Sequence, residues 1–257
     1  MKTAIVTGAA GDIGRAICAA LLSEGIAVAG FDVHPGRLEQ AGSELAALGR
    51  FLGVQVDVTN MTSIRAGVER VAGTLGDTSI LVNNAGGISR PSLLTTREED
   101  WLGDIDLNLN GPWRCIHALQ DTLIRCSPSV IVNIASVNGL GIYGHPGYSA
   151  AKAGLIHLTR FCAVELGKFG VRSVAICPGS VKTRAWEERR RLKPEIFTEV
   201  TGWYPSRDIC EPADIATLVA LVAGKPLSAM NGSILTIDGG LTAGSDRLAS
   251  LFTGETL

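Results

Sequence analysis

Short apolar runs alternate with amphipathic segments along almost the whole chain. The runs "KTAIVT", "IAVAGF", "FLGVQV", "SILVNN", "SVIVNIAS", "VRSVAICPG" and "GSILTIDGG" predict seven strands. Between them apolar residues recur at helical spacing, as Ile13, Ile17 and Leu21 do. Strands that are apolar on both faces are typical of a parallel sheet covered by helices. The pattern therefore predicts an α/β fold, with a doubly wound seven-stranded parallel sheet and helices on both faces.

No proline- or glycine-rich linker divides the chain, so we expect residues 1–257 to form a single Rossmann-type domain. The segment "VKTRAWEERRRLKPEIFTEVTGWYPSRD", residues 181–208, breaks the strand–helix rhythm. A connection this long usually has a function, and we expect a lid over the substrate rather than a solvated helix. Its arginine run 189–191 is interpreted as a solvated helix face. The sharper alternative is that one of these arginines meets an anionic group of the substrate.

Composition excludes several classes of partner. The 257 residues carry a formal net charge of −2, which provides no basic field for nucleic acid or an anionic membrane. The six cysteines lack the spacing of a metal site or a disulfide framework, which predicts free thiols and no bound metal. The first apolar run is too short for a signal peptide, and none is long enough to span a membrane. We therefore expect a cytoplasmic protein.

The stretch "TGAAGDIG", residues 7–14, follows the first strand and opens a helix. A glycine turn in this setting presents backbone N–H groups to a phosphate. Gly8 permits the tight turn, Gly11 removes bulk near the ligand, and Gly14 lets the helix pack on the strand. These features predict a site for the diphosphate of a dinucleotide.

Asp32 at the end of the second strand can accept both ribose hydroxyls of an adenosine and would repel a 2′-phosphate. It therefore favours NAD over NADP, although a capping or turn role is the alternative. Arg37 can in principle offset this repulsion, but we expect it on the surface of a helix. Asp12 is an acid where an anionic ligand should lie. We expect it to cap the helix that it opens, with its carboxylate directed away from the diphosphate.

A second group of residues has side chains that can transfer a proton. Tyr148 and Lys152 are four residues apart in a predicted helix and share one face. We expect the ammonium, together with a cationic nicotinamide, to lower the pKa of the phenol and make it a base. Ser136 ends the fifth strand, at the sheet edge where doubly wound proteins bind ligands. It can hold a substrate oxygen in line with the phenol.

The chain resembles the short-chain dehydrogenase/reductase family over nearly its whole length. The resemblance rests on "TGAAGDIG", "DVT" at 57–59, "NNAG" at 83–86, "YSAAK" at 148–152 and "PGSVKT" at 178–183. The family pattern normally has a small residue, usually Gly, where this chain has Asp12. Taken together, the residues and the resemblance imply a NAD site formed by Gly8, Gly11, Asp12, Ile13, Gly14, Asp32, Asp57, Val58, Asn84, Ala85, Gly86, Tyr148, Lys152, Pro178, Gly179, Val181 and Thr183.

The resemblance also implies a proton relay of Asn108, Ser136, Tyr148 and Lys152. Asn108 fits the family spacing better than Asn110 does, and its implied role is to hold a water that links Lys152 to solvent. Lys152 is further expected to bond the nicotinamide ribose. The expected substrate-binding residues are Ser136, Asn138, His145, Tyr148, Arg184 and Trp186. His145 precedes a proline and has the alternative role of shaping the turn.

The sequence thus predicts a NAD-dependent oxidoreductase that acts on a small polar secondary alcohol or ketone, with a sugar or polyol as one candidate. One alternative is a 3-oxoacyl thioester reductase, which would favour NADPH. Another class is a binding protein that senses NAD(H) without turnover, but such a protein usually lacks a relay residue, and none is missing here. The resemblance also implies a homotetramer, with the last strand at a subunit interface.

Overall fold

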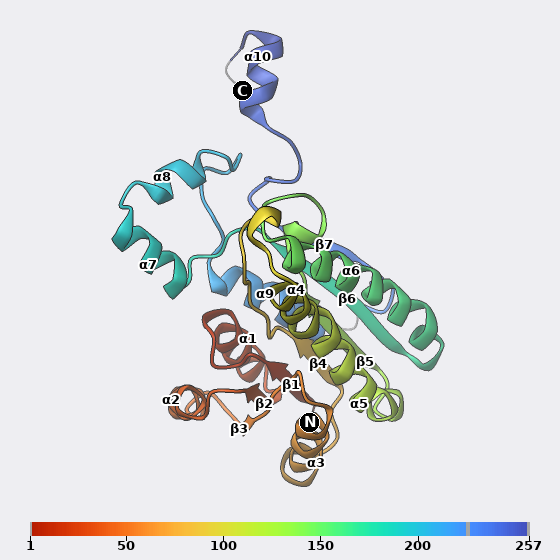
Figure 1. The fold of residues 1–257 in the computed structure, drawn as a ribbon. Helices are drawn as coiled ribbons and strands as arrows, with labels where there is room; N and C mark the ends of the chain where they lie inside the picture. The colour runs from red at the N-terminus through yellow and green to blue at the C-terminus, as the bar shows by residue number, and fades with distance from the viewer. Residues whose placement is uncertain (1, 225–226, 256–257) are drawn as a thin grey trace.

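A seven-stranded parallel sheet runs through the computed structural model, which describes residues 2–224 and 227–255. The strand order is β3-β2-β1-β4-β5-β6-β7. Figure 1 shows the sheet between two layers of helices, which confirms the predicted doubly wound fold. The strands are β1 (Thr3–Thr7), β2 (Ala27–Asp32), β3 (Phe51–Gln55), β4 (Ile80–Asn83), β5 (Ser129–Ile134), β6 (Val171–Pro178) and β7 (Ile234–Ile237).

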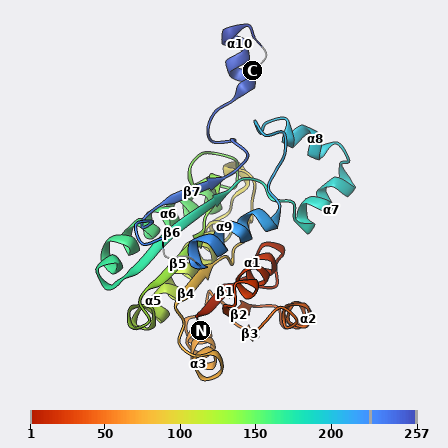
Figure 2. The ribbon, with the colours of Figure 1, turned by 180° about the vertical axis from the view of Figure 1, so that it is seen from behind.

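Two large hydrophobic cores occupy the two faces of the sheet, and a smaller third cluster includes Leu155. Successive residues of β1 divide between them, since Val6 packs in one core and Ile5 in the other. The first core is covered by α1 (Asp12–Ser23), α2 (Pro35–Leu45) and α9 (Pro212–Gly224), and the second by α3 (Met61–Leu75), α5 (Gly111–Arg125) and α6 (Pro146–Leu166). Figure 2 shows α9 and α1 side by side on the first face. Burial on both faces explains why the strands are almost entirely apolar.

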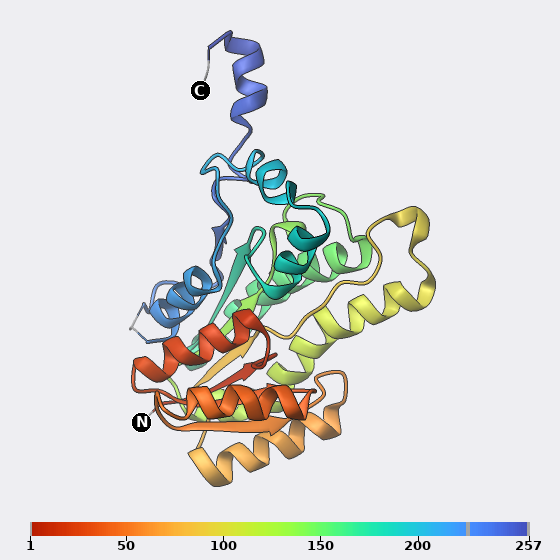
Figure 3. The same cartoon turned by 90° about the vertical axis from the view of Figure 1, so that its left-hand side faces the viewer.

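The remaining helices lie beyond the carboxyl ends of the strands. The helix α4 (Glu98–Ile105) passes into a π-helical turn, η2 (Asp106–Asn110), before α5 begins. The predicted lid contains two short helices, α7 (Arg184–Leu192) and α8 (Ile196–Thr201), which stand over this end of the sheet in Figure 3. After β7 the chain leads to α10 (Asp246–Thr253), which projects from the body in all three ribbon views.

The described residues contain neither a membrane-spanning helix nor a metal-binding cluster. No helix among them has both the length and the apolar character needed to cross a bilayer. No cluster of three or more His, Cys, Asp or Glu side chains in residues 2–224 and 227–255 has the arrangement of a metal site. All six cysteines are free thiols in the structure.

Candidate active site

The strand order reverses between β1 and β4, and this places a crevice beyond their carboxyl ends. Hydrogen bonds join the loops that follow these two strands. The backbone N–H of Asn84 donates to Thr7 Oγ1 at 3.0 Å, and Asn84 Nδ2 donates to the Thr7 carbonyl at 2.9 Å. The glycine turn and the "NNAG" loop therefore form one continuous wall of the crevice.

A cavity of about 450 Å³ lies against this wall. Gly8 has φ +65°, and a Cβ at Gly14 would lie 2.1 Å from the Gly8 carbonyl oxygen, so the turn requires glycine at both positions. Most of the expected cofactor residues line this cavity: Gly8, Gly11, Asp12, Ile13, Gly14, Asp32, Asp57, Val58, Asn84, Ala85, Gly86 and Thr183. Seven residues that were not expected there also line it, namely Ala10, Phe31, Val33, His34, Arg37, Val56 and Leu107.

The cavity suits a dinucleotide at both of its ends. No side chain caps α1 at Gly11, so the first backbone N–H groups of this helix remain available to an anionic ligand in the cavity. Asp32 Oδ2 accepts from the Ala10 N–H at 2.9 Å, and Oδ1 accepts from the His34 N–H at 3.0 Å. These bonds fix the Asp32 carboxylate at the cavity wall and leave further lone pairs for ribose hydroxyls. Arg37, which we expected on the surface of a helix, also lines the cavity and brings a positive charge to it.

The prediction that Asp12 caps α1 is wrong, because no side-chain cap exists at the start of this helix. Its carboxylate instead binds Arg184, which is 172 residues away in the sequence. Asp12 Oδ2 accepts from the Arg184 backbone N–H at 2.8 Å, and Oδ1 accepts from Arg184 Nε at 2.7 Å. Since Arg184 begins α7, the acid caps the lid helix and pairs with its first cation. Asp12 thus connects the glycine turn to α7, in the segment that is predicted to be a lid.

Replacing Asp12 with glycine is expected to loosen α7 without greatly changing the affinity for NAD. Arg184 already compensates the charge of the carboxylate, so the dissociation constant of NAD should change by less than about threefold. Trypsin should cleave the arginine run 189–191 about fivefold faster, since loss of a cap destabilises a helix end by about 1 kcal/mol. Fluorescence titration and timed proteolysis measure the two effects, and Asp12→Asn should be intermediate. If NAD binds tenfold more tightly to Asp12→Gly, the acid faces the diphosphate and this explanation fails.

The expected proton-relay residues meet around a second cavity, of about 340 Å³. Ser136, Tyr148 and Lys152 line it, and so do Pro178, Gly179, Val181 and Thr183, which belong to the expected NAD site. Lys152 Nζ donates to the Ile134 carbonyl at 2.8 Å, and the Asn138 N–H donates to Ser136 Oγ at 3.1 Å. Ile13 and Thr183 line this cavity and the first one, so the two are contiguous.

The pKa values of Tyr148 and Lys152 differ from the expectation that the lysine lowers the pKa of the phenol. Burial raises the pKa of Tyr148 above its usual value, and the neighbouring Ser136 only partly opposes this shift. Burial lowers the pKa of Lys152 to about 8. The Lys152 ammonium lies 5.4 Å from the centroid of the Tyr148 ring, beside its π-face. Without a bound cofactor, therefore, the lysine does not lower the pKa of the phenol as we expected, and Tyr148 is protonated at neutral pH.

Asn108 is fully buried in the π-helical turn η2. Its Nδ2 donates to the carbonyls of Gly87 and Asp104, each at 2.9 Å, and its Oδ1 accepts from the Gly87 N–H at 3.2 Å. A Cβ at Gly86 would lie 2.7 Å from Asn108 Oδ1 and 3.5 Å from Lys152 Nζ. Asn108 therefore packs behind the "NNAG" loop and near Lys152. Single π-turns often occur at functional sites, which is consistent with a role for Asn108 here.

A third cavity, of about 520 Å³, opens between the relay residues and the lid. Of the expected substrate-binding residues, Ser136, Asn138, His145, Tyr148 and Trp186 line it. Arg184 does not, because its guanidinium is held by Asp12. Arg189 also lines it, which agrees with the alternative interpretation of the arginine run 189–191. The sequence did not single out the side chains of Ile88, Val137, Tyr143, Val200, Trp203, Tyr204 and Leu241, which line the cavity as well. The aromatic residues of "GWYP", 202–205, were the only local signal for this role.

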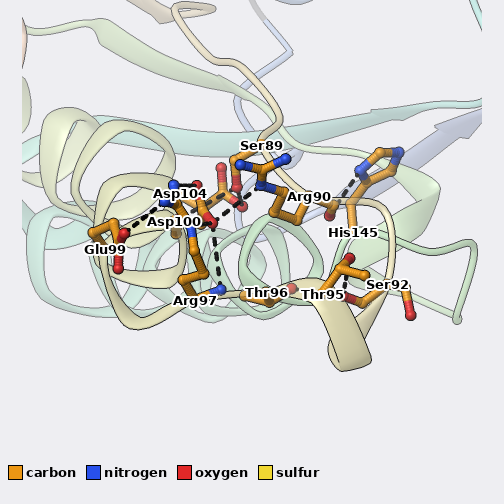
Figure 4. A network of polar contacts seen from close by, with 10 residues as sticks. All are labelled: Ser89, Arg90, Ser92, Thr95, Thr96, Arg97, Glu99, Asp100, Asp104 and His145. Carbon is orange, nitrogen blue, oxygen red and sulfur yellow. Dashed lines mark hydrogen bonds and ion pairs between the residues drawn. The ribbon is translucent and has the colours of Figure 1, made fainter.

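Polar contacts fix the rim of the third cavity near His145 (Figure 4). The ring nitrogen Nδ1 of His145 lies 3.2 Å from the Arg90 carbonyl oxygen, and the backbone of His145 is left-handed, with φ 55°. Arg90 and Arg97 both bind the Asp100 carboxylate, with Nε–Oδ2 distances of 3.1 and 2.7 Å. Because Arg97 donates to it, the pKa of Asp100 lies well below its usual range. His145 thus shapes the turn and lines the cavity as well.

Comparison with known sequences shows the family of this chain. The sequence profile of a family described as enoyl-(acyl carrier protein) reductase matches residues 8–242. A 3-oxoacyl-[acyl-carrier-protein] reductase of Thermotoga maritima is 33% identical over 93% of this chain and 97% of that protein.

Two solved structures have the same fold. A crystal structure of an oxidoreductase of the short-chain dehydrogenase/reductase family from Burkholderia thailandensis has a TM-score of 0.91 and 35% identity, covering 99% of this chain and 98% of that one. An actinorhodin polyketide ketoreductase variant, crystallised with NADPH, has a TM-score of 0.89 and 29% identity, covering 93% and 97% of the two chains. The chain therefore belongs to the short-chain dehydrogenase/reductase family, whose members are oxidoreductases that act on alcohol and carbonyl groups.

Proposed function

We propose that the protein is a NAD-dependent oxidoreductase that transfers a hydride between nicotinamide and a small polar secondary alcohol or its ketone. A sugar or polyol is a candidate from the sequence. The observation that carries the proposal is the meeting of Ser136, Tyr148 and Lys152 at one cavity, between the cavity at Asp32 and the cavity under the lid. Residues 1–257 act as one domain in this proposal, and residues 181–208 act as the lid.

Each relay residue has one role in the proposed reaction. When bound, the nicotinamide accepts a hydride with its two electrons from the alcohol carbon, and the hydroxyl proton leaves. Ser136 holds the substrate oxygen, and Tyr148 accepts this proton, or donates it in the reverse direction. Lys152 bonds the nicotinamide ribose and passes the proton toward a water held at Asn108. Because burial keeps the phenol protonated, the positive charge of the oxidised cofactor has to supply the stabilisation of the phenolate.

The proposed preference for NAD rests on Asp32, whose carboxylate would repel a 2′-phosphate. We expect NADH to bind at least about thirtyfold more tightly than NADPH, or ~2 kcal/mol, and Asp32→Asn to remove most of this difference. Titration of the intrinsic fluorescence with each cofactor measures the preference, and thermal unfolding checks that Asp32→Asn folds. Arg37→Ala is the companion variant. If the protein prefers NADPH and loses this preference with Arg37→Ala, the assignment of NAD is wrong.

The second candidate is the reduction of a 3-oxoacyl thioester. It is supported by the similarity to the Thermotoga maritima reductase and by the position of Arg37 in the cofactor cavity. This reaction uses the same relay residues, with NADPH as the expected donor. A 3-oxoacyl thioester offered with NADPH separates it from our first proposal, which predicts turnover of free alcohols with NAD.

The proposed assembly is a homotetramer in the cytoplasm. It is supported by the family membership and by the position of β7 at the sheet edge, from which α10 projects with Leu251 and Phe252 each 82% exposed. The six free thiols fit a reducing compartment. Light scattering behind a sizing column measures the assembly, and a monomeric mass would contradict it.

A further inference from the structure

The third cavity is lined by one arginine and by no carboxylate of the described residues. Its wall on the lid side is aromatic and apolar, with Trp186, Val200 and Trp203 facing the relay residues Ser136 and Tyr148. Among the described residues that line it there is no Asp or Glu, and Arg189 is the only Lys or Arg. Arg189 is itself exposed, so solvent weakens its attraction for an anion, but no carboxylate of this wall competes for it.

Arg189 differs from the two arginines that follow it. Arg190 pairs with Glu187 at 2.9 Å, and Arg191 pairs with Glu188. Within residues 2–224 and 227–255, Arg189 has no acidic partner and no hydrogen bond at its guanidinium. Its Cζ lies 5.0 Å from the centroid of the Trp186 ring, and this stacking holds the guanidinium at the cavity wall. The planar group thus keeps its N–H donors for a ligand, in the fork geometry that suits a carboxylate.

From these observations we propose that the substrate is a hydroxy acid, or the corresponding oxo acid, whose carboxylate binds Arg189 while its alcohol oxygen lies at Ser136 and Tyr148. The inference rests on the proposed function and narrows its substrate class. The reaction oxidises the R–CHOH group to a ketone and reduces NAD, and the alcohol proton leaves through Tyr148, so the carboxylate is unchanged. An apolar or aromatic part of the substrate would contact Trp186 and Trp203. An uncharged sugar or polyol would leave the only cation of this wall without a partner.

The test compares acids with their neutral esters. The probes are 3-hydroxybutyrate and phenyllactate, each with its methyl ester, and glycerol 1-phosphate reports on an alternative oxyanion. The wild-type kcat/KM with NAD should be about thirtyfold higher for an acid than for its ester, as expected for a bond to a charged group of ~2 kcal/mol. Arg189→Gln should remove this preference through KM and leave the ester within about twofold. Arg190→Gln is the matched control and should change neither.

The outcomes separate the two proposals. Equal turnover of acid and ester by the wild type, or equal loss on both with Arg189→Gln, overturns the carboxylate site and leaves the oxidoreductase proposal standing. A preference for glycerol 1-phosphate over both acids also overturns it. Binding to the NADH complex, followed by tryptophan fluorescence beside Arg189, provides a readout that does not need turnover. If acids bind selectively and this requires Arg189, but no alcohol is turned over, the anion site is supported and the proposed reaction is contradicted. If neither readout shows selectivity for acids, the inference is overturned.

Discussion

Replacing Tyr148 with phenylalanine is expected to lower kcat by about a thousandfold, the usual contribution of a general acid–base residue. The change removes only the phenol oxygen, so the ring should still pack beside Lys152 and the affinity for NADH should stay within about twofold. Absorbance of the reduced nicotinamide measures kcat, and fluorescence titration measures binding. The matched control is Tyr143→Phe, because Tyr143 lines the same cavity without a place in the relay.

The same variant separates an enzyme from a NAD(H) sensor. A sensor would keep its whole function without the phenol oxygen, whereas an enzyme keeps the cofactor and loses turnover. Retention of more than about a tenth of the wild-type kcat would show that another group carries the proton, since general acid–base catalysis contributes a hundredfold or more.

Replacing Lys152 with methionine is expected to reduce kcat by about a hundredfold or more and to stabilise the fold at neutral pH. Burial lowers the pKa of this lysine to about 8, so the folded state holds the ammonium at a cost of about 3 kcal/mol below that pH. Between pH 8 and the ordinary lysine pKa of about 10.5, the unfolded chain binds more protons than the folded one. The wild type should therefore gain stability relative to the variant as pH rises through this window.

Denaturant unfolding of both proteins at pH 7 and pH 9.5 measures the free energy of unfolding and so tests this prediction. Loss of the bond from Lys152 to the Ile134 carbonyl offsets part of the gain, by about 1 kcal/mol. Lys168→Met, at an exposed lysine, is the control and should change stability little at either pH. A constant difference between Lys152→Met and wild type from pH 7 to 9.5 would show that the buried amine does not titrate in this range.

The sheet could be predicted from the sequence because its chemistry is local. The strands β1, β2 and β5 are buried on both faces, so their apolar runs are distinct whatever the strands pack against. Helix signals are local too: the Asn60 side chain caps α3, residues Met61–Leu75, by accepting from the Ser63 N–H. The glycine turn was likewise predictable, since the positive φ of Gly8 and the close approach of Gly14 restrict both positions.

The features that were missed depend on partners far away in the sequence. Asp12 binds Arg184 rather than its own helix, and nothing near residue 12 indicates this choice. Arg189, Arg190 and Arg191 are alike in sequence, but only the first faces the cavity, which depends on how α7 sits over the sheet. The pKa of Tyr148 was misjudged for the same reason. Residue types predicted attraction to Lys152, whereas the folded structure adds a larger desolvation that they do not reveal.

The most direct test of the proposed function is the oxidation of alcohols by the purified protein, followed by the absorbance of the reduced nicotinamide. NAD and NADP are offered separately with hydroxy acids, polyols, sugars and simple secondary alcohols, and Tyr148→Phe provides the baseline. We predict turnover with NAD and much less with NADP, dependent on Tyr148, with hydroxy acids as the preferred class. Activity confined to NADPH and 3-oxoacyl thioesters would contradict both the role given to Asp32 and the substrate class.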